Sequence, residues 1–351
     1  MTGKTYIIIP NYTGGWKNTI ECLESVYRVD YPNTQIIVVD DGSRDDSLQH
    51  ILQWVRGERG SPISPQQPIK HRPLPPDSRI KRPIVFHDCD FNQTGKEDQS
   101  ALIVIRSTVN RGFAGANNLG LRFALEMDDF EYVWLLNNDT VVDEQALSHL
   151  VSRMRAKPGA GICGSTLLYY DCPDKVQTYG GVRYYRWAGL GKPVGANTQI
   201  RWDLSAEEIE KQMDYVYGSS MLVSKNFLRD IGLMNEEYFI YFEEIDWNMR
   251  AKGKYTLAFA PGSLVYHKAG ATVGGGYQEG ERNSLFSDYF YFKNMIRFTR
   301  KFSAWTLPGV YLRFSVIFLQ KIFGRQWASA WLLVKTAFNF PVNAARLWEK
   351  K

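Results

Sequence analysis

The stretch at residues 132–142, YVWLLNNDTVV, joins an apolar run to a cluster of polar side chains. Its first five residues favour β-structure and are bounded by turn-forming residues, which is typical of a central strand buried on both faces of a parallel sheet. Asn137, Asn138 and Asp139 follow at the carboxyl end of this strand. Ligands bind at that edge of open α/β sheets, and an acidic group there can hold a hard cation against a phosphate. A strand-to-helix turn with local hydrogen bonds explains the same residues equally well.

Strand and helix patterns alternate in the N-terminal part of the chain. Apolar, β-forming runs at residues 6–9 and 35–39 end in polar or turn-forming residues, namely Pro10 and Asn11 after the first run and Asp40 and Asp41 after the second. Apolar residues at helical spacing follow each run. Ser43 followed by Asp46 predicts a helix start, as an acidic variant of the capping box. This alternation indicates the beginning of a nucleotide-binding α/β sheet.

Length and composition indicate one catalytic domain with an appendage. The chain has 351 residues, of which 44% are apolar and 23% are charged, as in ordinary globular proteins. The formal net charge of +5 is small for this length, so we expect no nucleic-acid partner. The four cysteines form no CxxC pair and have no zinc-like spacing with histidine, which favours reduced thiols in a cytosolic protein.

Two further features favour a cytoplasmic location. The first residues, MTGKTYIIIP, lead almost directly into a strand and lack the basic and apolar regions of a signal peptide. The sequence also contains no uncharged apolar run of the roughly 18 residues that a transmembrane helix needs. We therefore expect neither export nor a membrane span.

Residues 57–100 differ in composition from the segments around them. Prolines and basic residues are frequent in the first part of this stretch and apolar residues are few. This composition predicts a flexible, Pro-rich surface insertion rather than a packed element. The apolar run within residues 101–107 then predicts a third strand.

A glycine-containing turn follows at residues 110–118, NRGFAGANN, and leads into a predicted helix. Gly112 allows close approach of the backbone to a ligand, backbone amides at a helix start favour phosphate, and Arg111 adds a cation. The turn matches neither GxGxxG nor GxxxxGK[ST]. Taken alone, it is a weak sign of phosphate binding.

The order of these motifs resembles that of the inverting glycosyltransferases of family 2, and the closest similarity is to a rhamnosyltransferase-like subgroup. The resemblance spans roughly residues 5–300. It rests on the tip of the first strand, VVDDGS at 38–43, NRGFAGANN at 110–118, LLNNDTVV at 135–142, YGSSML at 217–222, YFIYFEEIDWNMR at 238–250 and VYH at 265–267. It implies an α/β fold of the GT-A type over residues 1–284, with a mixed central sheet and helices on both faces.

The resemblance also implies where a nucleotide-sugar donor binds. Asp41 matches the aspartate that hydrogen-bonds a pyrimidine base, and Asp40 would contact the ribose or shape the turn. The residues expected to complete donor binding are Pro10, Asn11, Asn110, Arg111, Gly112, Asn117, Asn137, Asn138, Gly218 and Ser219.

The implied metal site replaces the first aspartate of the family's DxD element with Asn137. A Mg²⁺ or Mn²⁺ ion would therefore rest mainly on Asp139. His267 matches a histidine that completes the metal or diphosphate site, and an isolated histidine without this context would more simply be structural. The Gly-rich stretch at 270–276 is expected to close over the donor.

Three acids, Glu243, Glu244 and Asp246, occupy the position of the family's E-D-x-D motif at a predicted helix start. Inversion at an anomeric carbon needs one carboxylate to remove the proton of the acceptor hydroxyl. Glu244 is the expected base and Asp246 the alternative. Acids that merely complement a helix dipole would account for the composition but not for the flanking pattern. Trp247 could face an acceptor sugar or lie in the core.

Residues 285–351 read as amphipathic helices in which Trp, Phe, Leu and Val alternate with Arg and Lys. Such helices suit the plane of a membrane interface, where aromatic residues lie at headgroup depth and cations meet anionic lipid. A packed helical tail or a dimer interface is the competing interpretation. The first interpretation predicts a cytoplasmic protein bound peripherally to the inner face of the cell membrane.

The sequence thus predicts a metal-dependent inverting glycosyltransferase that moves a sugar from a dTDP- or UDP-sugar to a cell-surface glycan or lipid-linked acceptor. The subgroup resemblance favours dTDP-rhamnose, with a UDP-hexose as the alternative. A nucleotide-sugar pyrophosphorylase would need a basic Gly-rich loop after the first strand, which residues 11–16 lack. A non-catalytic glycan-binding scaffold with the same fold would tolerate loss of Asp139 and Glu244.

Overall fold

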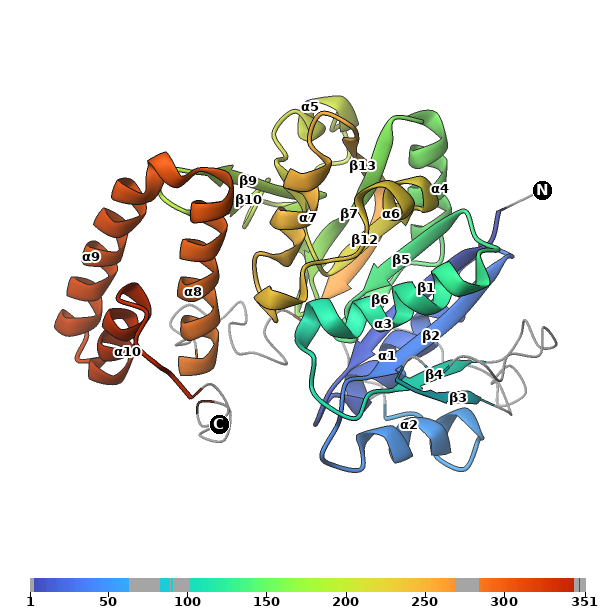
Figure 1. The fold of residues 1–351 in the computed structure, drawn as a ribbon. Helices are drawn as coiled ribbons and strands as arrows, with labels where there is room; N and C mark the ends of the chain where they lie inside the picture. The colour runs from blue at the N-terminus through green and yellow to red at the C-terminus, as the bar shows by residue number, and fades with distance from the viewer. Residues whose placement is uncertain are drawn as a thin grey trace.

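The computed structural model describes residues 3–62, 83–88, 90, 102–268, 284–343 and 347. A central mixed sheet carries helices on both faces, and the last helices of the chain lie together at one side of it (Figure 1). The α/β class with a mixed sheet, predicted from the sequence, is confirmed.

The central sheet has one parallel half and one mixed half. Its strand order is β3 (Ile84–His87), β4 (Ile103–Arg106), β2 (Thr34–Asp40), β1 (Thr5–Asn11), β5 (Tyr132–Leu136), β12 (Ser220–Ser224), β7 (Ala160–Tyr169), β13 (Thr256–His267) and β6 (Thr140–Val142), with β8 (Cys172–Tyr179) paired to β7. The strands from β3 to β5 are parallel, and β12 runs antiparallel to both of its neighbours. All of β5 is buried, as its apolar run predicts.

Two hydrophobic cores cover the two faces of this sheet. One face packs on α1 (Trp16–Val26), α2 (Ser47–Val55) and α4 (Ala146–Ala156), and the other on α3 (Gly112–Met127), α6 (Lys225–Ile231) and α7 (Glu243–Ala251). Trp247 is fully buried in the second core and donates from its indole nitrogen to the Gly232 carbonyl at 2.8 Å. It is therefore a core residue and does not face an acceptor.

Two local predictions need correction. Residues 84–87, expected within a flexible insertion, form β3 and extend the sheet beside β4, because their short apolar run can pair there. Residues 63–82, 89 and 91–100 of that insertion lie outside the described residues. The helix expected to start at Ser43 begins at Ser47 instead, since the Ser43 hydroxyl is held at the tips of β1 and β2, where it donates to Asp40 and accepts from the Asn11 amide.

A small antiparallel sheet stands beside the carboxyl edge of the main sheet. It consists of β10 (Leu190–Pro193), β9 (Gly181–Tyr185) and β11 (Tyr215–Val216). Because β9 follows β8 directly and β11 leads into β12, the small sheet is anchored to the large one at both ends.

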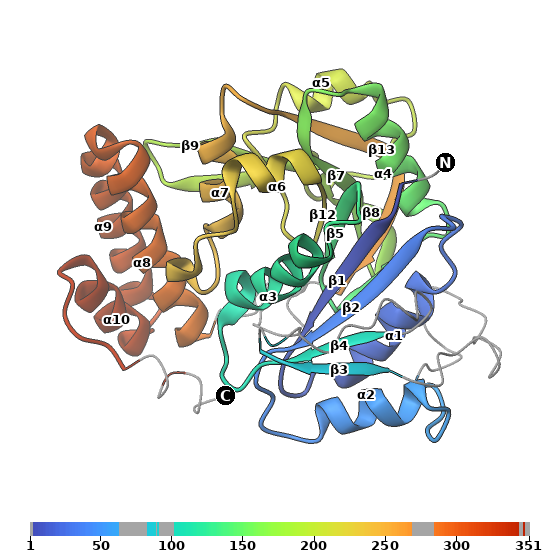
Figure 2. The same ribbon diagram turned by 45° about the vertical axis from the view of Figure 1, so that its right-hand side comes forward.

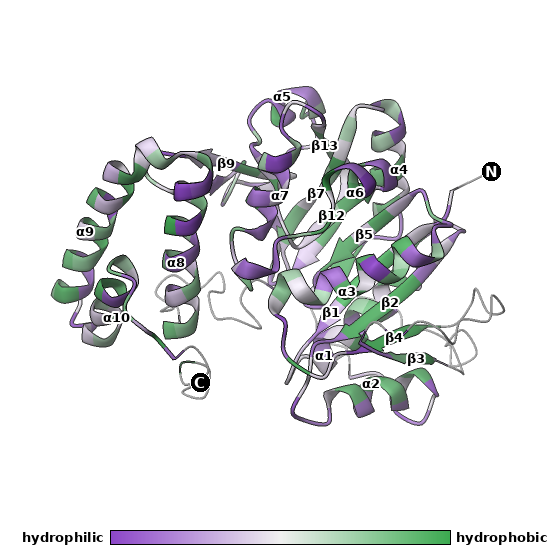
Figure 3. Cartoon of the chain, in the orientation of Figure 1, coloured by the Kyte–Doolittle hydropathy of each residue, from purple (hydrophilic) through white to green (hydrophobic). Residues whose placement is uncertain are grey.

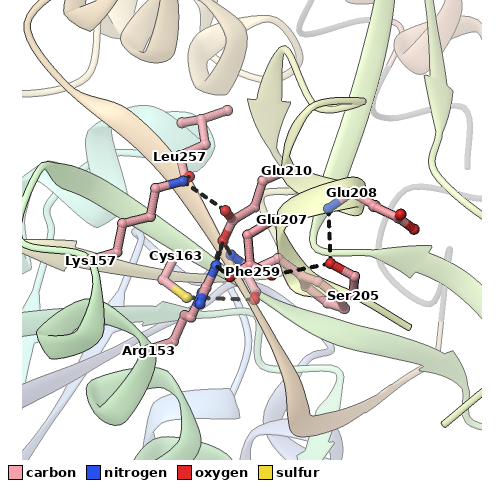
Figure 4. A network of polar contacts seen from close by, with 10 residues as sticks. Arg153, Lys157, Cys163, Ser205, Glu207, Glu208, Glu210, Leu257 and Phe259 are labelled. Carbon is pink, nitrogen blue, oxygen red and sulfur yellow. Dashed lines mark hydrogen bonds and ion pairs between the residues drawn. The ribbon is translucent and has the colours of Figure 1, made fainter. Parts of the chain in front are cut away.

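A buried ion-pair network ties the short helix α5 (Ala206–Glu210) to the sheet. The carboxylate of Glu210 accepts from Arg153 Nε at 3.0 Å, from Lys157 Nζ at 2.7 Å and from the backbone amide of Phe259 at 2.8 Å. Figure 4 shows these groups converging on Glu210 from α4 and β13. The network lies away from the predicted site and is structural.

The C-terminal region contains α8 (Leu285–Phe302), the single 3₁₀ turn η3 (Ala304–Thr306), α9 (Leu307–Phe323) and α10 (Trp327–Ala337). In both ribbon views α8 lies nearest to α7, whereas α9 lies at the far side of the molecule (Figure 1 and Figure 2). Buried residues of α8 and α9 share one core with Tyr184, Tyr238, Phe242 and Ile245. In the part of the chain that the structure describes, no helix has both the length and the hydropathy needed to cross a membrane.

Candidate active site

A cavity of about 500 Å³ opens at the carboxyl ends of β1 and β5, between the main sheet, the small sheet, the start of α7 and α8. Most of the residues singled out in the sequence line it: Pro10, Asn11, Asp41, Asn110, Gly112, Asn137, Asn138, Asp139, Gly218, Ser219, Glu244 and His267. Four others, Asp40, Arg111, Asn117 and Asp246, do not. Strand ends that are far apart in the sequence thus converge on one space.

Asp139 and His267 lie side by side at the base of this cavity. Thr140, in β6, pairs with His267, the last residue of β13, and this register brings the two side chains together. Nε2 of His267 is 3.2 Å from Oδ1 of Asp139, and both residues are buried. Burial by itself raises the pKa of the Asp139 carboxyl, but the neighbouring imidazole holds that pKa below its usual value. Asp139 is therefore ionised at neutral pH.

The surroundings of His267 leave Nε2 directed at Asp139. Nδ1 lies 2.8 Å from Oε1 of Gln177, a carbonyl oxygen that can only accept, so the proton is assigned to Nδ1. When a cation occupies the space between Nε2 and Asp139, the lone pair of Nε2 would be available to it as a ligand. Oδ1 of Asp139 is buried and makes no hydrogen bond to any residue within the described ranges. Histidine ligands commonly donate their second N–H to a carbonyl in this way.

These two donor atoms fit a divalent cation. An imidazole nitrogen and an unpartnered carboxylate oxygen face the same space, as a Mg²⁺ or Mn²⁺ site requires. The described part of the chain contains no cluster of three or more His, Cys, Asp or Glu side chains that could hold a metal. Asp139 and His267 would therefore need oxygen ligands from a bound diphosphate or from water. The Gly-rich stretch at 270–276 lies outside the described residues.

The two asparagines before Asp139 are held in different ways. Asn137 donates from its backbone to the Ser219 carbonyl at 3.1 Å and from its amide to the Ser219 hydroxyl at 3.3 Å. Asn138 donates to the Thr19 hydroxyl at 3.0 Å, and that hydroxyl donates to Oδ1 of Asn11 at 2.8 Å. Thr19 of α1 thus links the tips of β1 and β5 and fixes Asn11 and Asn138 at the cavity wall.

Asp41 joins the tip of β2 to the start of α3. Its two carboxylate oxygens accept the backbone N–H groups of Arg111 at 2.9 Å and Gly112 at 3.0 Å. Burial raises the pKa of the Asp41 carboxyl to about 7, although these two N–H donors oppose the increase. Asp40 is buried behind it and accepts from the Asn11 amide at 3.0 Å. Asp40 therefore shapes the turn from outside the cavity.

The glycine-containing turn contributes its backbone rather than its charged side chain. Gly112 has a φ of +71°, and a Cβ there would lie 2.3 Å from the Phe239 carbonyl oxygen, so the position requires glycine. The Arg111 guanidinium pairs with Asp88 at 3.0 Å and stays out of the cavity lining. Asn117 is buried within α3 and donates to the Phe113 carbonyl at 2.9 Å. Asn110 and Gly112 both line the cavity, but the Gly112 N–H already donates to Asp41 and Asn110, so only the Asn110 side chain is left as a candidate contact to a phosphate.

Glu244 faces the cavity from the first turn of α7. It accepts the backbone N–H of Gly218, and burial raises the pKa of its carboxyl to about 7. A Cβ on residue 218 would lie 2.2 Å from Oε1 of Glu244, so glycine is needed for this contact. A carboxylate with a pKa near the working pH is suited to general base catalysis.

Asp246, the alternative base, is turned away from the cavity. Its carboxylate accepts from Arg250 Nε at 2.9 Å, Lys301 Nζ at 2.5 Å and the Tyr238 hydroxyl at 3.1 Å. The side chain is fully buried within this network, which ties α7 to α8. The geometry favours Glu244 over Asp246 as the base.

Glu243 also lines the cavity but has little to stabilise a negative charge. Its Oε2 is buried and has no hydrogen-bond partner among the residues that the structure describes. Burial, with the nearby charge of Glu244, raises the pKa of Glu243 well above its usual value. The two neighbouring carboxyls thus both have raised pKa values, and that of Glu244 lies in the neutral range.

The segment before α7 holds a strained backbone beside the cavity. Phe239, Tyr241 and Phe242 have φ values of +63°, +67° and +76°, which non-glycine residues rarely adopt. Asn294 of α8 donates to the carbonyls of Tyr238 at 2.7 Å, Ile240 at 2.8 Å and Tyr241 at 3.0 Å. Such conformations persist where the surroundings fix them. α8 is thus part of the site.

Aromatic side chains form the half of the cavity around Glu244. They come from the small sheet, the strained segment and α8: Tyr184, Tyr215, Tyr217, Phe239, Tyr241, Phe242, Phe286 and Tyr291. Flat apolar faces with several hydroxyl groups suit a ligand that is both apolar and hydroxylated. Sequence reasoning did not identify this wall, nor Gln177 or Asn294, because single Gln, Asn and Tyr residues carry no motif. The only available signal was the density of aromatics at 238–242 and 286–292.

Comparison with known proteins identifies one family. The model of glycosyl transferase family 2 matches residues 6–64 and 93–232, which together make up more than half of the chain. A hexosyltransferase of low-salt glycan biosynthesis from Haloferax volcanii, Agl10, is 27% identical over 148 residues, or 42% of this chain and 45% of the relative. A poly-β-1,6-N-acetyl-D-glucosamine synthase from Staphylococcus epidermidis is 21% identical over 256 residues, or 73% of this chain and 48% of the relative. The chain thus spans about half the length of these curated relatives.

Solved structures share the fold. A mannosyltransferase from Pyrobaculum calidifontis, in complex with GDP-mannose and Mn²⁺, aligns with a TM-score of 0.50 at 15% identity and covers 100% of this chain and 89% of its own. GalNAc-T7 with UDP, GalNAc and Mn²⁺ aligns with a TM-score of 0.52 at 15% identity and covers 84% of this chain and 50% of its own. At such identities the similarity establishes the GT-A type of fold.

Proposed function

Because the chain belongs to glycosyl transferase family 2, we propose that it transfers a sugar from a nucleoside diphosphate donor to an acceptor hydroxyl, with inversion at the anomeric carbon. One observation carries this proposal: a single cavity contains both the Asp139–His267 pair, which fits a divalent cation, and Glu244, which fits a general base. The departing diphosphate can be held at the Asp139–His267 pair, and the acceptor hydroxyl can be activated at Glu244.

The donor is proposed to bind along the carboxyl ends of β1, β2 and β5. Pro10, Asn11 and Asp41 would contact the nucleoside, and the Asn110 side chain, which lines the same cavity, would lie near the diphosphate. Asp139 and His267 would hold Mg²⁺ or Mn²⁺. The ion would stabilise negative charge on the departing diphosphate. The nucleotide and Mn²⁺ in the mannosyltransferase and GalNAc-T7 structures are consistent with this assignment.

Glu244 is proposed to remove the proton from the acceptor hydroxyl. As that oxygen bonds to the anomeric carbon, the proton passes to the Glu244 carboxylate and the bond between the anomeric carbon and the diphosphate oxygen breaks. A single displacement from the opposite face inverts the configuration at this carbon. The aromatic half of the cavity lies around Glu244 and would position the acceptor sugar.

The favoured donor is dTDP-rhamnose, on the motif resemblance to rhamnosyltransferase-like enzymes, and a UDP-hexose is the second candidate. Asp41 cannot discriminate between them, because thymine and uracil present the same hydrogen-bonding edge. The hexosyltransferase and glucosamine-polymer synthase among the relatives support an acceptor that is a cell-surface glycan or a lipid-linked precursor of one.

Calorimetric titration with dTDP, UDP and GDP, each with Mn²⁺ and then with EDTA, tests this function. Metal-dependent binding of a pyrimidine diphosphate is the expected result, and the preferred base narrows the donor. Proton NMR of the product formed from the matching nucleotide sugar should then show the inverted anomer. Absence of binding to all three nucleotides would reject the transferase proposal in favour of a non-catalytic scaffold.

A further inference from the structure

α9 presents a continuous apolar stripe to solvent. Leu312, Val316, Leu319 and Phe323 are exposed, and their spacing of three or four residues places them on one face of the helix. Phe323 is 84% exposed. Figure 3 shows hydrophobic residues recurring along α9 and α10 at the side of the molecule away from the main sheet. None of these four residues belongs to a hydrophobic core formed by the described residues.

α10 continues the stripe with tryptophans. Trp327 and Trp331 are four residues apart, so they share a face, and both are more than half exposed. We name Leu312, Val316, Leu319, Phe323, Trp327 and Trp331 the α9–α10 face. Nearby, exposed Trp187 and Trp305 pack edge to face with ring centroids 5.1 Å apart. Tryptophan concentrates where one end of a side chain is apolar and the other is wet.

The charged residues within residues 303–343 have one sign: this stretch contains no Asp or Glu, whereas it contains Arg313, Lys321, Arg325 and Lys335. Lys321 is neutralised by Asp288 of α8 at 2.7 Å, and Arg313 donates to the carbonyls of Ala188 and Gly189. Arg325 is exposed, and Lys335 lies 5.8 Å from the ring of Trp331. An apolar stripe flanked by these two cations is complementary to an anionic lipid headgroup layer.

We propose that the α9–α10 face docks in the interface plane of an anionic lipid bilayer. The exposed Trp and Phe side chains enter the headgroup region, and the flanking cations meet lipid phosphates. A second copy of the chain is the poorer occupant, because two acid-free faces would bring like charges together. The surface is assigned independently of catalysis.

If the proposed function holds, docking of the α9–α10 face on a membrane also places the Glu244 half of the cavity near a lipid-linked acceptor. α8 packs against both α9 and α10, while its residues Phe286 and Tyr291 line the aromatic half of the cavity. The Glu244 half of the cavity is therefore connected to the lipid-facing helices by one helix. A lipid-linked acceptor could reach Glu244 from the membrane along this side.

Co-sedimentation of the full chain with phosphatidylcholine vesicles, with and without phosphatidylglycerol, tests the proposal. The chain should sediment with the anionic vesicles and much less with the neutral ones. The double variant Phe323→Glu/Trp331→Glu should lose about tenfold or more of the binding, because charge is driven into the interface. Trp202→Glu is the matched control: Trp202 is 72% exposed but lies before α5, and its loss should leave binding unchanged.

Three outcomes would overturn the proposal. The wild-type chain could fail to sediment with either vesicle, or the double variant could bind as well as the control. Light scattering could instead reveal a dimer that the double variant abolishes, which would assign the face to a second copy. Nucleotide titration of the same variants separates these results from failure of the proposed function, since the face does not line the cavity.

Discussion

The side-chain amide of Asn294 donates a hydrogen bond to the Tyr241 carbonyl at 3.0 Å, joining α8 to a left-handed residue that lies two positions before Glu243. The same amide nitrogen also reaches two further carbonyls of this segment. A residue of the C-terminal region thereby fixes the backbone that aims Glu244 at the cavity.

Asn294→Ala should therefore impair catalysis more than donor binding. Without the amide, the carbonyls of Tyr238, Ile240 and Tyr241 lose a donor, and the free energy of unfolding should fall by about 1–3 kcal/mol. The strained segment can then relax and move Glu244, so kcat should fall at least tenfold while the nucleotide Kd changes little. Ser315→Ala on α9 is the control, because its exposed hydroxyl donates to the Tyr311 carbonyl within that helix and lies outside the cavity lining. Equal kcat values for the two variants would remove the positioning role.

Asp139→Ala should abolish metal-dependent nucleotide binding, because the variant lacks the carboxylate oxygen that faces His267. Gln177→Ala should weaken Mn²⁺-dependent binding by about 10- to 100-fold, the usual cost of losing the partner that orients a histidine ligand. Titration calorimetry with and without EDTA measures both. Asp143→Ala, on the other side of β6 and outside the cavity, should bind like the wild type. Unchanged affinity in Asp139→Ala would contradict the cation site.

The transfer rate should rise with pH through about 7. The pKa of Glu244 is raised by burial to about 7, and a base must be deprotonated to accept a proton, so activity is low below that pH and levels off above it. Glu244→Gln should bind donor normally but lose transfer at every pH. Asp246→Asn should keep the ascending limb and instead lower the unfolding temperature. A dead Asp246→Asn beside an active Glu244→Gln would reverse the assignment.

Glu243→Gln should stabilise the protein at pH 8 more than at pH 5. Because the pKa of Glu243 is raised on folding, the unfolded chain releases this proton first, and the wild type loses stability as pH rises above the ordinary pKa of glutamate. Gln cannot ionise and escapes that loss. Thermal unfolding of both proteins at the two pH values measures the difference. A stabilisation that is equal at both would mean that Glu243 is not protonated in the folded state.

Glu210→Ala should destabilise the fold by about 1–3 kcal/mol, because it removes the buried carboxylate that accepts from Arg153, Lys157 and the Phe259 amide, while Arg153 keeps Glu207 as a partner. Glu208→Ala, an exposed residue of the same helix, should change stability little. Urea unfolding distinguishes the two variants. Since the network lies outside the cavity, nucleotide affinity should be unaltered in the folded fraction of both, and a selective loss of binding would contradict its structural role.

The sequence by itself determined the strands that form the cavity edge. Apolar runs ending in Asn11, Asp41 and Asp139 predict parallel strands, and carboxyl ends of parallel strands meet at one edge, so these residues had to lie close together. The acids at the start of α7 could likewise be predicted, because a helix start after YFIYF carries its own signal. Periodicity even restricts the base, since Glu244 and Asp246 are two residues apart on a helix and cannot face the same way.

Tertiary structure alone decided which partners surround these residues. His267 meets Asp139 through the register of β6 with β13, and Gln177 reaches His267 from β8, pairings between strands that are distant in the sequence. Asn294 belongs to the site only because α8 packs beside α7, whereas the Arg111 guanidinium pairs with Asp88 outside the cavity. Long-range contacts of this kind depend on how whole elements pack, and no local pattern of residue types encodes them. The sequence therefore specified the edge of the site, and packing specified its partners.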